Sequence, residues 1–341
     1  MAIDRVEIKD FFVFKGEFTA NFCPGVNVLI GANATGKTTL LKVMYVICKY
    51  YPQLSLMNER EFGEGKAHSN FTRALNINNY FPDDKNYEFS NLTLEEDVNH
   101  ACLKSYTQTN GIKSSVRLIY KGFDDRSLYI PEKDILEHAK GLLTFIEQKQ
   151  TGFGQIYRNV LISAQDIPTQ VQSETQRKVG KMIVDTIGGE ARWDKGEGSF
   201  YTLRTDGVRI PFANEASGYK KLGFLGLLVT SGQLEKGSVL FWDEPENSLN
   251  PELLPVLVDI LLELQRGGVQ IFLATHSEIL ASYFSVNRQD GDSVMFYSLY
   301  KDGEQIKADK SERFDVLTPN TLTAEQTKLY EKELERTFGN G

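Results

Sequence analysis

The alternation of apolar and polar residues near the N-terminus predicts short β-strands. Apolar side chains recur at short intervals from Ile3 to Ala20, and the pattern breaks at Lys15-Gly16. A period near two is typical of a strand with one buried face. A continuous apolar run at residues 26–30 then precedes a glycine-rich stretch. We therefore expect two or three short strands that lead into that stretch.

From residue 174 onward, segments with helical and strand-like periods follow one another, as in an α/β protein. A helix over residues 174–187 ends at Gly188, and a last helix over 323–338, of mixed charge, begins with the capping box Thr323 and Gln326. The other predicted segments are strands at 199–204, 208–212, 239–242, 270–274, 294–300 and 305–307, and helices at 217–230 and 251–265. We expect the last helix to be exposed, which makes it a candidate docking surface.

The middle of the chain carries weaker patterns. A helix after the glycine-rich stretch should end near residues 51–52, and residues 52–112 lack sustained periodicity, which predicts an insertion of irregular structure. The remaining predictions are a hairpin of residues 115–121 and 126–130 that turns at 122–125, helical spacing over 131–150, and a core strand at 160–163. No internal repeat and no heptad run of coiled-coil length is visible.

The most informative stretch is residues 31–38, GANATGKT, which separates the apolar run from a mostly apolar segment at 40–47. Its spacing, G-x-x-x-x-G-K-S/T, suits phosphate binding, because glycines let consecutive N–H groups and a helix N-terminus face one anion. Lys37 can then reach the terminal phosphates, and the Thr38 hydroxyl can ligate magnesium. This stretch indicates a nucleotide-phosphate site more strongly than a ligand-free loop between a strand and a helix.

A pair of adjacent carboxylates, Asp243 and Glu244, follows the predicted buried strand at 239–242. Alternate residues of a strand face opposite ways, so the two acids can take different roles. Asp243 can hold magnesium, and Glu244 can activate or orient the water that attacks the γ-phosphate. If the two acids stood alone, an acid-rich surface turn would explain them better. The phosphate loop upstream argues against that explanation.

Two further segments are candidates for the same site. His276 directly follows the predicted strand at 270–274, where its ring could hydrogen-bond a γ-phosphate, although a lone histidine is more often structural. Ser217 and Gly218 open a predicted helix, and Ser217 at an N-cap position would offer N–H groups and a hydroxyl to an anion. An ordinary capped helix is the better explanation of these two residues alone, and the order of all the motifs reverses that preference in favour of the anion site.

Composition limits the choice of partner and compartment. The net charge of -8 argues against a dedicated nucleic-acid coat, although a local basic groove can lie within an acidic total. The cysteines, Cys23, Cys48 and Cys102, form no CxxC pair, which predicts reduced thiols of a cytoplasmic protein. No stretch reaches the roughly eighteen uncharged apolar residues of a membrane span, so we expect no membrane association.

The order GANATGKT, ASGYKK, VLFWDEPENSLNP and LATHS resembles that of the ABC-type ATPase heads of the RecF and structural-maintenance-of-chromosomes (SMC) group. It is most similar to the compact bacterial ATPases related to the OLD (overcoming lysogenization defect) family. The resemblance covers residues 1–50 and about 160–300. In that family, the signature serine and glycine of one subunit cap the γ-phosphate held by the loop of another, so that ATP lies between two heads.

The resemblance implies ATP and Mg²⁺ as cofactors and gives each motif a role. Asp243 would hold magnesium through water, Glu244 would be the base, and His276 would sense the γ-phosphate, with Lys37 completing the catalytic set. Residues 248–250 fall where the family's D-loop crosses the dimer interface. The implied nucleotide-binding residues are Gly31, Asn33, Ala34, Thr35, Gly36, Lys37, Thr38 and Thr39, with Ser217 and Gly218 acting in trans.

Two positions depart from the family pattern. The family's Q-loop glutamine follows a strand between the first two motifs, and the best topological match here, residues 128–133, contains no glutamine. Gln165, after the predicted strand at 160–163, is the other candidate for the Q-loop glutamine, which would lie at the metal. Relatives also carry an early arginine where this chain has FFVFK at residues 11–15. Lys15 could replace it near the phosphates, or the aromatic cluster could simply pack the core.

These observations predict an α/β P-loop NTPase with ABC-ATPase-head topology. We expect N-terminal antiparallel strands and a mixed central sheet flanked by helices, with an inserted irregular and helical region. The expected division is a head at 1–51 and 160–310, an insertion or lid at 52–159, and a C-terminal helix within 311–341.

The favoured function is an ATP-hydrolysing switch that forms an ATP-sandwiched homodimer and controls a separately encoded effector, such as a nuclease in anti-phage defence. The chain has no acid-rich cluster of the Toprim kind after His276, so toxic chemistry would lie elsewhere. The alternative is a RecF-like repair or recombination ATPase that binds DNA directly. A transporter subunit, which normally carries LSGGQ, and a non-hydrolysing scaffold, which would not need Glu244, fit less well.

Overall fold

The computed structural model describes residues 2–55, 87–88, 100–107, 113–121, 126–133, 136, 139, 141–143, 155–165 and 171–338. Most of the insertion predicted at residues 52–112 lies outside these residues. The turn expected at 122–125 and most of the helical spacing at 131–150 lie outside them as well.

Within the described residues, a six-stranded sheet forms the centre of the molecule in the order β14-β13-β3-β12-β11-β7. All of its strands are parallel except β14, which pairs antiparallel with β13 at one edge. The strands are β3 (Val26–Gly31), β7 (Ser127–Ile130), β11 (Val239–Asp243), β12 (Gln270–Ala274), β13 (Val294–Asp302) and β14 (Gln305–Ser311). Parallel neighbours bring their carboxyl ends to one edge, and that edge carries the candidate site.

Two antiparallel sheets flank the centre. The first, in the order β2-β1-β6-β5-β4, contains β1 (Ala2–Phe11), β2 (Phe14–Asn21), β4 (Tyr87–Glu88), β5 (His100–Thr107) and β6 (Lys113–Lys121). The second, in the order β10-β9-β8, contains β8 (Gly189–Asp194), β9 (Ser199–Arg204) and β10 (Arg209–Pro211). Antiparallel N-terminal strands and a mixed central sheet are the predicted fold class, which is confirmed.

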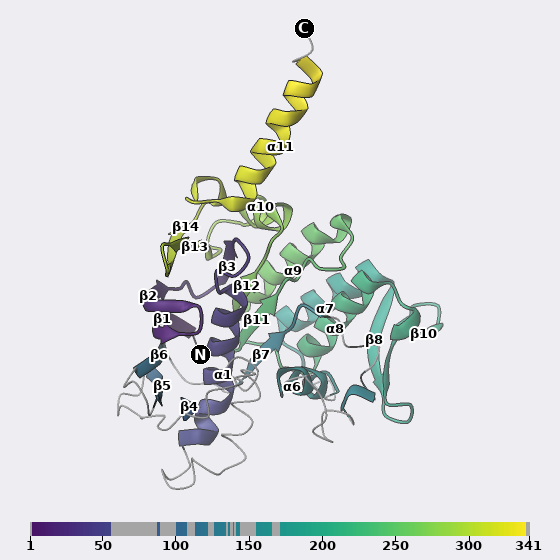
Figure 1. Cartoon of the computed structure of the whole chain (residues 1–341). Coiled ribbons are helices and arrows are strands. Elements are labelled where there is room, and N and C mark those ends of the chain that lie inside the picture. The colour runs from purple at the N-terminus through teal and green to yellow at the C-terminus, as the bar shows by residue number, and fades with distance from the viewer. Residues whose placement is uncertain are drawn as a thin grey trace.

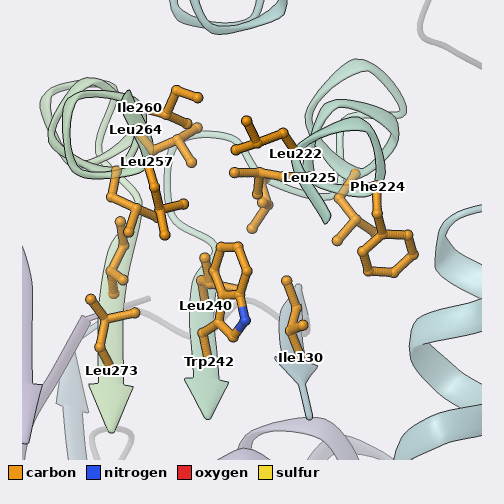
Figure 2. Packing of buried hydrophobic residues seen from close by; sticks show 14 of the residues in the cluster. Ile130, Leu222, Phe224, Leu225, Leu240, Trp242, Leu257, Ile260, Leu264 and Leu273 are labelled. Atoms are coloured by element: carbon orange, nitrogen blue, oxygen red, sulfur yellow. The ribbon is translucent and has the colours of Figure 1, made fainter. Parts of the chain in front are cut away.

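Helices cover both faces of the central sheet (Figure 1). On one face, α1 (Lys37–Ser55) lies between this sheet and the N-terminal one, and Phe241 packs in the same core cluster as α1. On the other face, Leu240 and Trp242 pack beneath α8 (Ser217–Thr230) and α9 (Leu254–Arg266), as Figure 2 shows. Burial on both faces explains why β11 reads as the unbroken run VLFWD. The other helices are α6 (Gln155–Ser163), α7 (Glu174–Ile187), α10 (Glu278–Asn287) and α11 (Thr321–Phe338).

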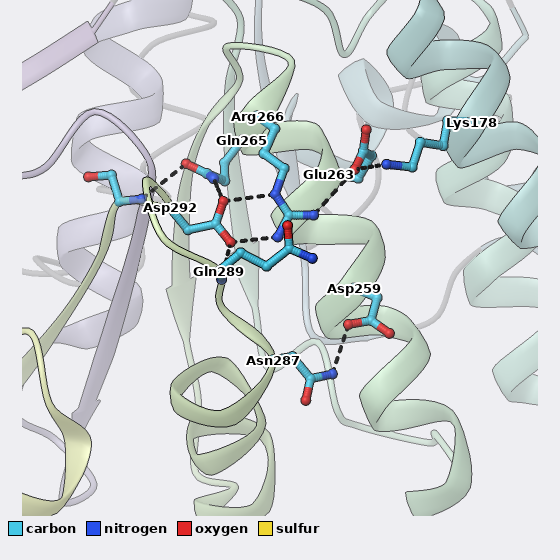
Figure 3. A network of polar contacts seen from close by, with 9 residues as sticks. Lys178, Asp259, Glu263, Gln265, Arg266, Asn287, Gln289 and Asp292 are labelled. Carbon is cyan, nitrogen blue, oxygen red and sulfur yellow. Dashed lines mark hydrogen bonds and ion pairs between the residues drawn. The ribbon is translucent and has the colours of Figure 1, made fainter.

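A polar network ties α9 to its neighbours (Figure 3). Asp292, whose side chain is 3% exposed, accepts hydrogen bonds from Arg266 at 2.8 and 2.5 Å and from Gln265 at 2.6 Å. Arg266 also donates to Glu263 at 3.3 Å, and Glu263 accepts from Lys178 of α7 at 2.6 Å. The segment after α10 and helix α7 are thereby fixed to the same central helix.

Several predicted elements are confirmed with their bounds. Helix α7 spans the predicted residues, with Gln176 completing a capping box at Ser173 and Gly188 adopting a left-handed conformation as its C-cap. Helix α8 and strand β12 also match the predicted 217–230 and 270–274. Strand β8 and helix α10 carry no strong periodic signal and were not predicted.

Two predictions for the middle of the chain are wrong. The expected hairpin of 115–121 and 126–130 does not form, because β6 pairs with β1 and β5 whereas β7 pairs with β11 of the central sheet. The expected core strand at 160–163 is the end of helix α6, which buries Ile156, Val160 and Leu161. A short apolar run does not distinguish a strand from a buried helix face.

Helix ends also differ from expectation. Helix α1 continues to Ser55, beyond the expected end near residues 51–52. Helix α11 begins at Thr321 rather than after Thr323, and the side chain of Asn320 accepts the Thr323 N–H at 3.2 Å. The predicted capping box at Thr323 is therefore wrong, and Asn320 takes the capping role. Among the helices in the described ranges, none is both long and apolar enough to cross a membrane.

Candidate nucleotide site

The loop between β3 and α1 has a backbone that glycine alone can follow at two points. Gly31 and Gly36 have φ angles of 147° and 89°. A Cβ at Gly36 would lie 2.7 Å from the Phe14 ring, and one at Gly31 would lie 2.2 Å from the Leu299 carbonyl oxygen. Ala34 also has a positive φ, of 59°, which costs on the order of 1–2 kcal/mol for a residue with a Cβ. Strain of this kind concentrates at functional loops.

Lys37 is buried within this loop. Its ammonium group donates to the carbonyl oxygens of Gly31 at 2.8 Å and Ala32 at 3.1 Å. Burial lowers the pKa of Lys37, and the nearby carboxylates of Asp243 and Glu244 oppose that shift. The loop therefore holds a cation against its own backbone carbonyls.

Asp243 lies at the end of β11 with a hydrogen-bond donor at each carboxylate oxygen. Thr38 donates its hydroxyl to Oδ1 at 3.1 Å, and Tyr129 donates its hydroxyl to Oδ2 at 3.0 Å. Burial raises the pKa of Asp243, whereas these two hydrogen bonds lower it. Burial, together with the neighbouring Asp243, raises the pKa of Tyr129 well above its usual range.

The Thr38 hydroxyl and Asp243 carboxylate are oxygen ligands of the kind that Mg²⁺ prefers. In the part of the chain that the structure describes, no group of three or more His, Cys, Asp and Glu side chains could enclose a metal. A cation at Thr38 and Asp243 would take its other ligands from phosphate and water, as magnesium does at nucleotide sites. These residues therefore fit a Mg²⁺–nucleotide complex.

Glu244 and His276 face each other across the same sheet edge. Glu244 has a left-handed φ of 48°, and its N–H donates to the Ala274 carbonyl at 2.8 Å. Its Oε1 lies 3.6 Å from His276 Nε2. Burial raises the pKa of Glu244, with contributions from the carboxylates of Glu132 and Asp243. Burial and the nearby Lys37 lower the pKa of His276, so the neutral ring is favoured near pH 7.

These groups line one cavity of about 550 Å³. Its walls come from the loop, the start of α1, the sheet edge and the β1–β2 turn; the lining residues are Asp10, Phe12, Val13, Lys15, Asn33, Ala34, Gly36, Lys37, Thr38, Thr39, Glu244 and His276. Phe11 and Phe14 of the FFVFK segment are buried in the core, as one alternative expects, and Lys15 lines the cavity, where the other alternative requires it. A volume of this size suits a small-molecule ligand.

Ser217 and Gly218 are not among the residues that line this cavity. Ala216 is the N-cap of α8, so Ser217 is the first helical residue and the prediction of Ser217 as N-cap is wrong by one position. Ser217 is exposed, whereas a Cβ at Gly218 would lie 2.7 Å from Leu253 Cδ1. The start of α8 thus packs against the segment that follows Glu244 and not over the loop of its own chain.

Gln165 also lies away from this cavity, at the end of α6, where it lines a different hollow. Strand β7 instead occupies the position beside β11, with Ile130 opposite Trp242. Glu132 follows β7 and Glu244 follows β11, and the Glu132 carboxylate is near enough to contribute to the raised pKa of Glu244. The segment 128–133, which the sequence offers as the topological match to the family's glutamine, therefore lies beside the site.

Three residues near the site carry no motif that the sequence reveals. Tyr129 and Glu132 belong to the β7 segment, whose position beside β11 depends on sheet order rather than on local pattern. Glu246 accepts from the Thr275 hydroxyl at 2.7 Å and from the His276 N–H at 2.9 Å, which fixes the segment that carries the histidine. Its place in the sequence DEPE, two residues after Glu244, is the one available signal.

Comparisons with known proteins agree with this geometry. Residues 1–150 match a family model described as "AAA ATPase domain", and residues 155–282 match one described as "AAA domain, putative AbiEii toxin, Type IV TA system". No curated protein matches the chain.

Solved SMC heads are similar in fold. The SmcHead bound to the C-winged helix domain of ScpA is 13% identical, with a TM-score of 0.50 over 91% of this chain and 98% of that one. The SMC head domain from Thermotoga maritima is 13% identical, with a TM-score of 0.48 over 92% and 100%. The Smc head domain bound to the C-terminal domain of ScpA derived from Pyrococcus furiosus is 10% identical, with a TM-score of 0.44 over 97% and 99%.

The fold, the loop with its acid pair and the two matched models define the class of protein: a P-loop ATPase, an enzyme that hydrolyses ATP. Within that class, AAA-type ATPase models match on both sides of residues 151–154, and the fold is similar to that of SMC heads.

Proposed function

We propose that this chain is an ATP-driven switch in which two copies enclose ATP at composite sites. The main observation behind this proposal concerns the cavity formed by the loop, Glu244 and His276. Ser217 and Gly218 of the same chain are not among the residues that line it. Ser217 is exposed at the start of α8, where a second copy could meet it. In this arrangement, residues 31–39 of one copy bind the phosphates, and Ser217 and Gly218 of the other copy close the site.

Each residue near the phosphates has a distinct part in hydrolysis. Lys37 neutralises charge on the terminal phosphates, and neutral His276 can donate one ring N–H to the γ-phosphate. Glu244 accepts the proton of the attacking water, a role for which a raised pKa suits a carboxylate. Thr38 and Asp243 would hold Mg²⁺, which would help to neutralise the negative charge of the phosphates.

The Glu244→Gln variant tests this mechanism. It should retain ATP binding, lose turnover by at least about a hundredfold, and double in native mass when ATP is added. Lys37→Ala should lose ATP binding. Glu252→Gln, at an exposed glutamate, is the matched control and should behave as the wild type. Unchanged turnover in Glu244→Gln, or a mass that ATP does not alter, would contradict the proposal.

We further propose that the switch controls a separately encoded effector, as in compact OLD-like ATPases of anti-phage defence. The toxin description of the model matched by residues 155–282 supports this, as does the partner protein named with the SMC head. The head would comprise residues 1–51 and 160–310, with an insertion or lid at 52–159 and the C-terminal helix within 311–341 as further parts. Copurification of the tagged chain with its neighbouring gene products tests this part, and recovery of the chain alone would count against it.

A further inference from the structure

A second hollow, of about 690 Å³, lies between α7, α8 and β8 and shares no lining residue with the nucleotide cavity. One face of each helix forms its walls, because the lining positions recur every three or four residues. These positions are Arg177, Gly180, Lys181 and Val184 on α7, and Gly223, Gly226, Leu227 and Thr230 on α8. The volume lies within the range of small-ligand sites.

Two glycines in the helix interiors keep this hollow open. A Cβ at Gly180 would meet nothing within 4 Å, and one at Gly226 would make only ordinary contacts with Ile183 at 3.5 Å. Neither glycine has a left-handed φ. Glycine is the least favourable residue of a helix interior after proline, so it normally answers a need for close packing or an unusual backbone. Neither close packing nor an unusual backbone requires glycine at these two positions, so the effect of the two glycines is to leave empty volume.

The rim of the hollow is basic, although the chain as a whole carries a net charge of -8. Its lining includes Arg177, Lys181, Arg192 and Lys195, against the single carboxylate of Glu190. Arg192 pairs with Glu190 at 2.8 Å, and Arg177 donates to the Gln172 carbonyl at 3.2 Å. Within the described ranges, Lys181 and Lys195 have neither a hydrogen bond nor an ion pair. The buried Nε2 of Gln165, which lines the same hollow, also has no hydrogen-bond partner there.

The floor is apolar and includes the aromatic ring of Trp193. Trp193 and Ala191 project from the same face of β8, since alternate strand residues share a face, and the Ala191 Cβ lies against α8 at Gly223. Trp193 is half-buried, and its ring packs against Phe200 at 4.6 Å between centroids. Leu227 and Ile183 continue the apolar surface.

We propose that this hollow binds a small organic anion, whose apolar or aromatic body lies against Trp193 and Leu227. Its carboxylate or phosphate is held at Lys181 and Lys195, and Gln165 donates to one of its acceptors. The volume, the uncommitted donors and the two glycines each point to such a ligand. The ligand would contact α8, the helix that begins with Ser217, but the site does not depend on the proposed dimer.

The test uses 8-anilinonaphthalene-1-sulfonate, an aromatic sulfonate whose fluorescence rises on binding, titrated into the full chain without nucleotide. We expect saturable binding of about one probe per chain. Gly226→Leu and Gly180→Leu, which fill the hollow, should each weaken binding at least about tenfold without lowering the melting temperature. The matched control is Gly141→Leu, at an exposed glycine whose Cβ also meets nothing, and it should bind as the wild type.

Two further variants separate this site from the nucleotide cavity. Lys37→Ala should leave probe binding unchanged, and the double variant Lys181→Gln, Lys195→Gln should weaken it in a well-folded chain. The probe is then displaced from the Lys37→Ala protein with two competitors. Displacement by adenosine monophosphate would identify the bound anion as a phosphate, and displacement by dodecanoate would identify it as a carboxylate. No binding to the wild type, binding to both filled variants as tight as to the wild type, or displacement by neither anion would overturn the proposal.

Discussion

At the scale of single residues, the chemistry of the site depends on how Asp243 is kept charged inside the molecule. Its carboxylate is buried, which disfavours the ionised form, and two hydroxyl donors oppose that effect. Thr38 belongs to the loop motif, whereas Tyr129 comes from an edge strand. We expect Tyr129 to act as a positioning residue that fixes the carboxylate for magnesium.

Replacing Tyr129 with phenylalanine tests this role. The variant keeps the ring that packs against Tyr45 but removes a hydrogen bond to a charged group, which is worth about 1.5–3 kcal/mol. The Mg²⁺ concentration for half-maximal ATPase activity should rise by about tenfold or more. Tyr297→Phe removes a comparably buried hydroxyl that bonds Asn21 and Asn27, so it should leave the Mg²⁺ dependence unchanged. An unaltered Mg²⁺ response in Tyr129→Phe would refute the role.

The pH dependence of turnover tests the surroundings of Glu244. A base must be ionised, and the pKa of Glu244 is raised above the usual 4.5 by burial and then by Glu132. Turnover should therefore fall as pH drops through that raised value. Glu132→Gln removes a negative neighbour, so the pKa of Glu244 should fall and the acid limb of the kcat profile should move to lower pH. The profile of Glu252→Gln should coincide with the wild type; an acid limb that Glu132→Gln does not move would contradict this electrostatic account.

At the scale of elements, the site edge is held by helices whose contacts are partly polar. Helix α9 buries Leu257, Ile260 and Leu264 toward the sheet and carries the network of Arg266 and Asp292 on its outer side (Figures 2 and 3). Because Asp292 accepts four hydrogen bonds while almost fully buried, its loss would leave several donors unpaired.

Asp292→Ala should therefore lower the free energy of unfolding by about 2–3 kcal/mol. For a chain of this size that corresponds to a fall in melting temperature of several degrees, about 2–4 °C per kcal/mol. The control is Asp259→Ala on the same helix, where an exposed carboxylate accepts one bond from Asn287, and its effect should stay within about 0.5 kcal/mol. Equal melting temperatures for the two variants would show that the network does not stabilise the fold.

Elements whose signals lie within one segment of the sequence were predictable, whereas the pairing of strands from distant segments was not. Helix α7 was predictable because its cap, its glycine stop and its periodicity all lie within the segment, and helix α8 and strand β12 were predictable from their own runs of apolar residues. The loop and the acid pair were predictable for the same reason. The pairing of β7 with β11 was not predictable, because the sequence of β7 is equally compatible with a hairpin. The contributions of Tyr129 and Glu132 to the site follow from that pairing, so they were not predicted either.

At the scale of the whole molecule, the candidate residues fall into two groups in one chain. The loop, Asp243, Glu244 and His276 meet at the carboxyl edge of the central sheet, whereas Ser217 begins a helix that packs on the segment after Glu244. Helix α11 extends away from both groups and buries none of its residues, which leaves it available to a partner (Figure 1). The proposed switch would join the two groups by bringing a second copy onto the first.

Mixing two inactive variants tests the composite site most directly. Lys37→Ala removes the loop function, and Ser217→Arg blocks the exposed signature position without disturbing the core. Each variant alone should lack ATPase activity, because every dimer it forms has two defective sites. An equal mixture contains mixed dimers with one intact site, so turnover should recover to about a quarter of the wild-type rate. A mixture as inactive as its components, or full activity of Ser217→Arg alone, would contradict the claim that ATP is hydrolysed between two copies of this chain.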